Sequence, residues 1–299
     1  MKNDHLNQHL NLSYHSHPLP DSYLDLQSCS TESVCKQDAP SPEQTHYLKS
    51  LRRFQFKVHF LQILGFILFL TFWQLLSSTE IINPFIFSSP LRIVKTFWSM
   101  LLDKSIFPHI GITLLETFIS FFLVLFISIL GAVLLWWNKT LSAVAEPYLV
   151  VLNSLPKSAL APLLLVWFGA TVKMILITSV SVVIFGSILT IYTGFKETDP
   201  DKIMLIETLH GSKWHTLRYV VIPESIPLLF GVMKSNIGLC LVGVIIAEFM
   251  GARMGLGYLI IYSSQVFKLD WVLMSIVLLC LIAMGLYGVL GKLEKRIVG

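Results

Sequence analysis

Charged residues are scarce in this sequence. Only 13% of its 299 residues are Asp, Glu, Lys or Arg, whereas 54% are hydrophobic. Soluble domains carry about 25% charged residues, so this chain does not have enough polar groups to cover a surface in water. The composition excludes a soluble globular protein and predicts an integral membrane protein. The formal net charge of +4 then reflects membrane topology rather than nucleic-acid binding.

Short motifs for catalysis, nucleotide binding and metal binding are also missing. The four cysteines form no CxxC pair, which argues against a disulfide framework or a zinc site. The sequence contains no GxxxxGK[ST], GxGxxG, HExxH or GxSxG pattern. We therefore predict that this chain is not an enzyme and holds no metal or cofactor of its own.

Long apolar runs dominate what is present. A helix needs about 20 apolar residues to span the hydrocarbon core of a membrane. Six runs reach this length: residues 58–77, 112–136, 147–168, 174–194, 227–249 and 271–291. Before the second run, Ser89 and Pro90 provide an N-cap and a first helical residue. The short amphipathic segment that follows them is expected to lie at the membrane interface.

These runs divide the chain into three parts. Residues 1–50 are rich in His, Ser, Asn, Asp and Pro, and they are predicted to form a disordered cytoplasmic tail. Residues 51–105 hold the first span and a periplasmic amphipathic helix. Residues 106–299 form a five-helix core. With the N-terminus inside, twelve Lys and Arg residues fall in inside segments and six in outside segments, which places both termini in the cytoplasm.

Several charged side chains lie inside the apolar runs, where each costs at least ~2.5 kcal/mol to insert. Such residues usually face a bundle interior or a watery cavity, although Lys157 could also snorkel to a surface, and Glu248 could sit near the outer mouth. Lys234 and Glu248 lie too far apart on one run to pair with each other. The candidate residues of a translocation path are Glu116, Asn153, Lys157, Lys234 and Glu248.

Proline and glycine residues interrupt the apolar runs of the core at two places. Pro156 and Pro162 interrupt the third run, which is tolerated where neighbouring groups satisfy the freed carbonyls. Gly251, Gly255 and Gly257 follow Glu248 and make a continuous helix there unfavourable. We expect a short re-entrant or interfacial element facing outward after residue 250.

The inside segment 196–224 is too polar to cross a membrane. We expect a short helix that begins near Asp199 or Asp201, a corner at His210 and Gly211, and a second helix from Ser212 to about Pro223. At 100° per residue, one face of the second helix carries Trp214, Leu217 and Val221, and the other His215, Thr216 and Tyr219. The pattern fits either a docking element or a linker helix lying on the membrane.

The motif IETLHGSKWHTLRYVVIPESIP resembles the cytoplasmic "EAA" loop of ABC-importer permeases. NPFIFSSP, LNSLPKSALAPLLLVWFG, and VIIAE with GARMGLGYLI resemble further family segments in one register from about residue 83 to 299. The likeness is to the subfamily for nitrate, taurine, aliphatic sulfonates and thiamine precursors. The first half of the loop motif departs from the family. Met204, Leu205 and Ile206 stand at the glutamate and small-residue positions, and His210 stands at the glycine position.

This resemblance implies the transmembrane subunit of a type I ABC importer, multi-pass in the bacterial inner membrane and working by alternating access. Two copies would enclose the path, and a separate ATPase dimer would bind ATP and dock on residues 196–224. A periplasmic or lipid-anchored solute-binding protein would dock near 78–109 and 250–270. Trp214 and Leu217 would be the docking knobs. The implied coupling residues are Glu207, His210, Gly211, Ser212, Lys213, Trp214, Leu217, Arg218 and Pro223.

Two other functions remain open from the residues alone. A stand-alone channel or ion-coupled carrier would use Glu116, Lys157 and Lys234 as an internal relay, and a membrane scaffold would bind through its N-terminal tail. The solute is open too. Lys157 and Lys234 would suit an anion, whereas three aromatic residues would suit the ring of a thiamine precursor: Trp167, Phe168 and Tyr192.

Overall fold

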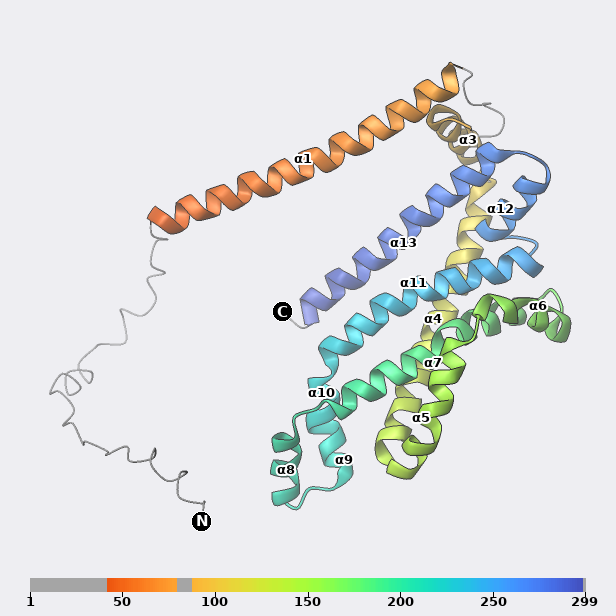
Figure 1. Cartoon of the computed structure of the whole chain (residues 1–299). Helices are drawn as coiled ribbons and strands as arrows, with labels where there is room; N and C mark the ends of the chain where they lie inside the picture. Colours follow the sequence, from red (N-terminus) through yellow and green to blue (C-terminus); the bar gives the residue numbers. More distant parts are fainter. Residues whose placement is uncertain (1–41, 80–87, 298–299) are drawn as a thin grey trace, which may run out of the picture. The chain divides into compact units, whose positions relative to one another are not determined.

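The computed structural model describes residues 42–79 and 88–297 (Figure 1). It divides into two units, residues 1–66 and residues 67–299, and the packing described below belongs to the second. The first helix, α1 (Pro42–Ser78), begins inside residues 1–50, the segment predicted to be a disordered tail. The rest of that predicted tail lies outside the described residues.

Every regular element in the described ranges is helical, which confirms the all-α prediction. After α1 come, in order, α3 (Pro90–Leu102), α4 (Ile106–Trp137), α5 (Lys139–Ser154), α6 (Lys157–Phe168), α7 (Val172–Lys196), α8 (Pro200–Thr208), α9 (Lys213–Thr216), the π-helix η2 (Leu217–Val221), α10 (Ile222–Glu224), α11 (Ile226–Gly251), α12 (Leu256–Gln265) and α13 (Leu269–Ile297).

The predicted spans have counterparts among these helices. Residues 56–78 of α1, together with α4, α7, α11 and α13, are long and apolar enough to cross a membrane. Helices α5 and α6 are each too short to span the membrane alone, and they meet at an angle of 91°. A sixth span is counted only if this bent pair is taken as one span. The prediction of one run over 147–168 is therefore corrected to a broken pair.

The break between α5 and α6 follows from local sequence. Pro156 has no backbone N–H, and the residue before a proline is driven away from helical geometry. Leu155 accordingly adopts an extended conformation, with φ −62° and ψ 141°. Helix α6 then runs over Lys157–Phe168 and is followed by Gly169, whose φ of 65° favours glycine. The break places the start of α6 beside α7 and α11.

Short polar side chains set several helix starts. The Ser89 hydroxyl accepts a hydrogen bond from the backbone N–H of Arg92, as predicted for α3. Asn138 caps α5 and Thr171 caps α7 in the same way. Each oxygen satisfies a backbone N–H that has no partner within its helix, which matters most where water is scarce.

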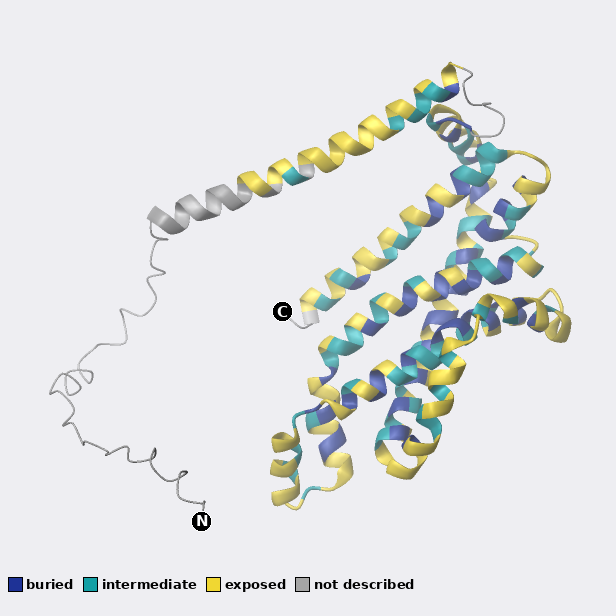
Figure 2. Ribbon diagram, viewed as in Figure 1, coloured by how far each residue is buried: buried dark blue, intermediate teal, exposed yellow. Residues whose placement is uncertain are grey.

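Helices α4, α7 and α11 pack together and carry much of the buried surface (Figure 2). Small residues allow α7 and α11 to approach closely, because a Cβ atom on Gly243 would lie 2.8 Å from the Cα of Ser179. The Ser179 hydroxyl donates to the carbonyl of Cys240 at 3.0 Å. In a membrane, where burial drives helix association weakly, such close packing and interhelical hydrogen bonds hold helices together.

Gly243→Ala should lower the stability of the protein although alanine is the better helix former. The methyl group meets backbone atoms of α7, and overpacking of this kind costs about 1–3 kcal/mol. Gly238→Ala, in the same helix but with open space around it, is the matched control and should gain up to about 1 kcal/mol. Thermal unfolding of the detergent-solubilised variants tests this. Equal midpoints for the two variants would contradict the packing described here.

Candidate functional site

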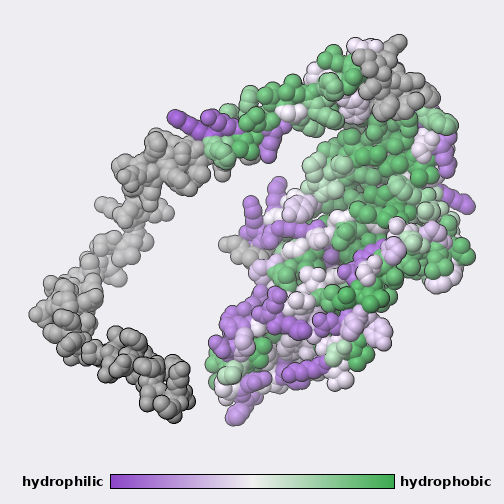
Figure 3. Space-filling model, in the orientation of Figure 1, coloured by the Kyte–Doolittle hydropathy of each residue, from purple (hydrophilic) through white to green (hydrophobic). Residues whose placement is uncertain are grey.

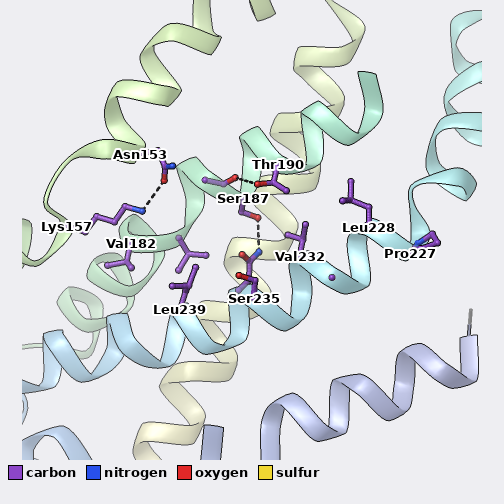
Figure 4. Close-up of a pocket in the computed structure, with 14 residues that line it drawn as sticks. Asn153, Lys157, Val182, Ser187, Thr190, Pro227, Leu228, Val232, Ser235 and Leu239 are labelled. Carbon is purple, nitrogen blue, oxygen red and sulfur yellow. Dashed lines mark hydrogen bonds between the residues drawn. The ribbon is translucent and has the colours of Figure 1, made fainter. Parts of the chain in front are cut away.

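A cavity of about 580 Å³ lies between α5, α6, α7 and α11 (Figure 4). Its volume is within the range of small-molecule sites, which is about 300–1,000 Å³. One wall is aliphatic, with Val182 and Val183 from α7 and Leu239 from α11. The polar part of the lining is contributed by Asn153, Lys157, Ser187, Thr190, Ser235 and Asn236.

The polar residues of the cavity are connected in pairs. The Lys157 ammonium donates to Asn153 Oδ1 at 3.0 Å, and Asn236 Nδ2 donates to Ser187 Oγ at 2.7 Å. Neither a carboxylate nor an aromatic ring is among the fourteen lining residues. The cavity therefore carries one positive charge that no lining group neutralises.

A second buried cluster joins α4 to the start of α12. Glu248 is 1% exposed, and its Oε1 accepts a hydrogen bond from the Thr113 hydroxyl at 2.7 Å. Glu248 Oε2 accepts from the backbone N–H of Gly257 at 2.5 Å, while Thr113 accepts from Leu256 N at 2.8 Å. Glu116 of α4 is also buried and lies close to Glu248.

The predicted interruption after residue 250 is confirmed, and the Glu248 cluster explains it. Helix α11 ends at Gly251, and α12 starts at Leu256. Gly255 has a φ of 112°, and a Cβ atom there would collide with the Glu248 carboxyl group. Only glycine fits both the backbone conformation and the close approach. The Nδ1 atom of His109 accepts a hydrogen bond from the Gly255 N–H at 3.1 Å.

Lys234 lies neither at the cavity nor in the Glu248 cluster. It forms an ion pair with Glu294 of α13, and its ammonium lies 5.8 Å from the centre of the Tyr287 ring. The five path candidates are thus found in three places: Asn153 and Lys157 at the cavity, Glu116 and Glu248 at the α12 cluster, and Lys234 with Glu294. Sequence reasoning missed Glu294, since a partner 60 positions away gives no local signal.

The segment 196–224 forms the two short helices that were predicted. Asp199 caps α8 by accepting from Asp201 N, and His210 makes the corner with a φ of 57°. Ser212 and His215 cap α9, their side chains 2.7 Å apart. The surface of this segment is mostly exposed (Figure 2), and hydrophilic side chains gather at this end of the molecule (Figure 3).

Leu217 does not occupy the surface position expected of it. It is 1% exposed and packs with Phe195, whereas Trp214 is 53% exposed. Thr216, expected on the opposite face, is buried too. The side of the segment that packs against the core carries Thr216, Leu217 and Val221, and Trp214 lies outside this buried side. Trp214 remains available for docking, and Leu217 anchors the segment to the core.

An ion pair fixes α8 relative to α10. Lys202 Nζ lies 2.9 Å from Glu224 Oε1, and this hydrogen bond raises the pKa of the Lys202 ammonium. Neither Lys202 nor Glu224 was a predicted coupling residue. The charged coupling candidates Glu207, Lys213 and Arg218 are exposed, as is Pro223, whereas Gly211 is partly covered. Gly211 N bonds back to the carbonyl of Ile206 at 2.8 Å, which closes the corner between the helices.

Several helices of membrane-spanning length, a solute-sized cavity beside two of them, and short polar helices at one end are features of a multi-pass membrane transport protein. The particular family follows from its sequence model. The chain belongs to the binding-protein-dependent transport system inner membrane component family, whose model matches residues 124–298, more than half of the chain. The predicted resemblance to ABC-importer permeases is thereby confirmed.

Relatives agree with this assignment. The chain is 27% identical over 263 residues to the riboflavin transport system permease protein RibX of Chloroflexus aurantiacus, covering 88% of this chain and 98% of that one. It is 25% identical over 228 residues to the putative aliphatic sulfonates transport permease protein SsuC of Bacillus subtilis, covering 76% and 79%. The fold resembles that of a chain in the inward-facing MetNI methionine ABC transporter, with a TM-score of 0.55, 18% identity, and coverage of 62% and 92%.

Thr113→Val should destabilise the protein by about 2–4 kcal/mol. The change keeps the volume but removes the Thr113 partner of Glu248 Oε1 and of the Leu256 N–H, and each loss costs about 1–3 kcal/mol. Thr117→Val is the matched control. Thr117 is equally buried, but its hydroxyl bonds only to the Thr113 carbonyl of its own helix. Chemical denaturation in detergent measures both, and similar losses for the two variants would contradict a clamp at Thr113.

Proposed function

We propose that the chain is the permease subunit of an ATP-driven importer in the bacterial inner membrane, with both termini in the cytoplasm. Two copies would enclose the path, and a separate ATPase dimer would bind the ATP. A solute-binding protein would dock outside, near residues 78–109 and 250–270. The observation that carries the proposal is the apolar surface of the segment 196–224, considered together with the family.

Large apolar side chains are exposed on α8 and α9. Met204, Leu205 and Leu209 are exposed on or beside α8, and Trp214 is exposed on α9. They occur at an end of the molecule rich in charged groups, including Lys202, where lipid would not cover them (Figure 3). Exposed apolar patches rimmed by polar residues mark interaction sites. A groove on an ATPase subunit would cover these side chains, and the same patch makes the alternative of a membrane-lying linker less favourable.

The order of the helices in the chain supports a connection between docking and the cavity. Helix α7 leads directly into α8, and α10 leads directly into α11, so the helices that line the cavity flank the docking segment. Leu217 and Val221 pack into one core with Phe195 of α7. A push on α8 and α9 would thus move α7 and α11 and change which side of the membrane the cavity faces. This is alternating access with the chemistry performed by the partner.

The arrangement of charges disfavours an ion-coupled carrier. A relay would need Glu116, Lys157 and Lys234 in series, yet each is engaged with a different neighbour in a different part of the bundle. The solute is a small molecule for which the relatives offer two classes. One is an organic anion, such as the aliphatic sulfonates in the name of SsuC, and the other a heterocycle, such as the riboflavin in the name of RibX.

Trp214→Ala should reduce the amount of ATPase subunit that co-purifies with the tagged chain. A buried tryptophan at an interface contributes about 2 kcal/mol or more, so the loss of affinity should be about thirtyfold or greater. Trp98→Ala is the control, because Trp98 is similarly exposed but belongs to α3. Quantitative mass spectrometry of the purified complexes measures the ratio of subunits.

Leu217→Ala tests whether Leu217 contributes to packing in the core, in contrast to the docking role of Trp214. It should lower the thermal midpoint of the chain, because it opens a cavity in the core and costs about 2–5 kcal/mol. The proposal fails if no ATPase accompanies the unaltered chain from its native membrane. Equal recovery of ATPase with the Trp214 and Trp98 variants would remove Trp214 from the docking surface.

A further inference from the structure

We propose that the cavity between α5, α6, α7 and α11 selects a small organic anion with an aliphatic body. In this proposal, Lys157 contacts the negative charge, and Asn153 positions the Lys157 ammonium. The inference rests on the proposed permease function and goes beyond it, because it decides between the two solute classes and assigns residues to the choice.

Aromatic residues do not support a ring-shaped solute at this site. The three that would suit a heterocycle lie elsewhere. Trp167 and Phe168 are exposed at the far end of α6, and Tyr192 is buried in a core cluster with Leu217. None of them lines the cavity. A flat heterocycle would therefore find no face to stack on in this lining, whereas Val182, Val183 and Leu239 offer an aliphatic surface.

The charge of the lining favours an anion. Lys157 supplies the one charged group among the lining residues, and a cationic solute would meet it with no carboxylate to compensate. The Lys157 ammonium has three donor protons, and the structure assigns one of them to Asn153. Two donors remain for a solute, and the Ser187 and Ser235 hydroxyls are further donors in the same cavity. Charge-assisted hydrogen bonds of this kind are roughly twice as strong as neutral ones.

Asn153 is a positioning residue whose own place depends on Gly186. A Cβ atom on Gly186 would lie 2.9 Å from Asn153 Oδ1, so any larger residue would push the amide away. That oxygen is the one that accepts from Lys157. Because residue 186 has no side chain, α5 can lie close to α7, and Asn153 can hold the Lys157 ammonium at the cavity.

The test is isothermal titration of the full chain, purified in detergent together with its ATPase. Two pairs of probes are used, propanesulfonate with neutral propanesulfonamide, and butyrate with neutral butyramide. An anion of at least one pair should bind, and its neutral counterpart should bind at least about tenfold more weakly. Equal binding within both pairs, or binding of neither anion, would overturn the proposal.

Variants test the named residues. Lys157→Gln should weaken anion binding by at least about tenfold, and Lys157→Arg should retain most of it. Asn153→Asp should weaken it as well, because the new carboxylate would neutralise the ammonium. Unchanged affinity in the Gln variant would overturn the role of Lys157. The Arg variant and the thermal midpoint of each protein separate loss of charge from loss of folding.

Gly186→Ala and Gly231→Ala form the control pair for positioning. Both glycines are in helices and line the cavity, but only residue 186 faces Asn153, whereas Gly231 has open space around it. The 186 variant should lose anion affinity and the 231 variant should keep it. The same samples also test the permease function. If the ATPase still co-purifies but no anion binds, only the inference about the solute is contradicted. An unaltered chain that purifies without ATPase would instead count against the proposed function.

Discussion

A helix that stops within a membrane bundle leaves backbone N–H and C=O groups without partners, and lipid cannot supply any. This constraint governs both interruptions of the bundle. Before α12, the N–H groups of Gly255, Leu256 and Gly257 are taken by His109, Thr113 and Glu248. Before α6, Pro156 has no N–H to satisfy. Side chains thus complete the hydrogen bonding at the break before α12, whereas the break before α6, which has no side-chain cap, lies beside the cavity.

The same constraint explains where the buried charges lie. The carboxyl group of Glu248 accepts a backbone hydrogen bond at the start of α12, and Glu116 lies close to it. Lys234 is matched by Glu294, so neither leaves an unpaired charge in the bundle. Lys157 differs, because its described partner is the neutral amide of Asn153. This unbalanced charge is the observation from which the proposed anionic solute is inferred.

Sequence reasoning was most successful where a signal was local. The lengths of the apolar runs located the spans, Ser89 and Pro90 located α3, and the glycines after Glu248 located the break. It failed where geometry or distant partners decided. The helical wheel grouped Leu217 with Trp214, but it could not show that contacts with Phe195 of α7 would bury Leu217. The contact of Thr113 with Glu248 joins residues 135 positions apart, and no local pattern could have revealed it.

Two cross-links tie the segments on either side of the docking loop to each other. Lys202 of α8 pairs with Glu224 of α10, and deeper in the bundle Ser187 of α7 accepts from Asn236 of α11. Both links join the part of the chain before the loop to the part after it. If the loop docks an ATPase as proposed, its displacement would therefore act on α7 and α11 together.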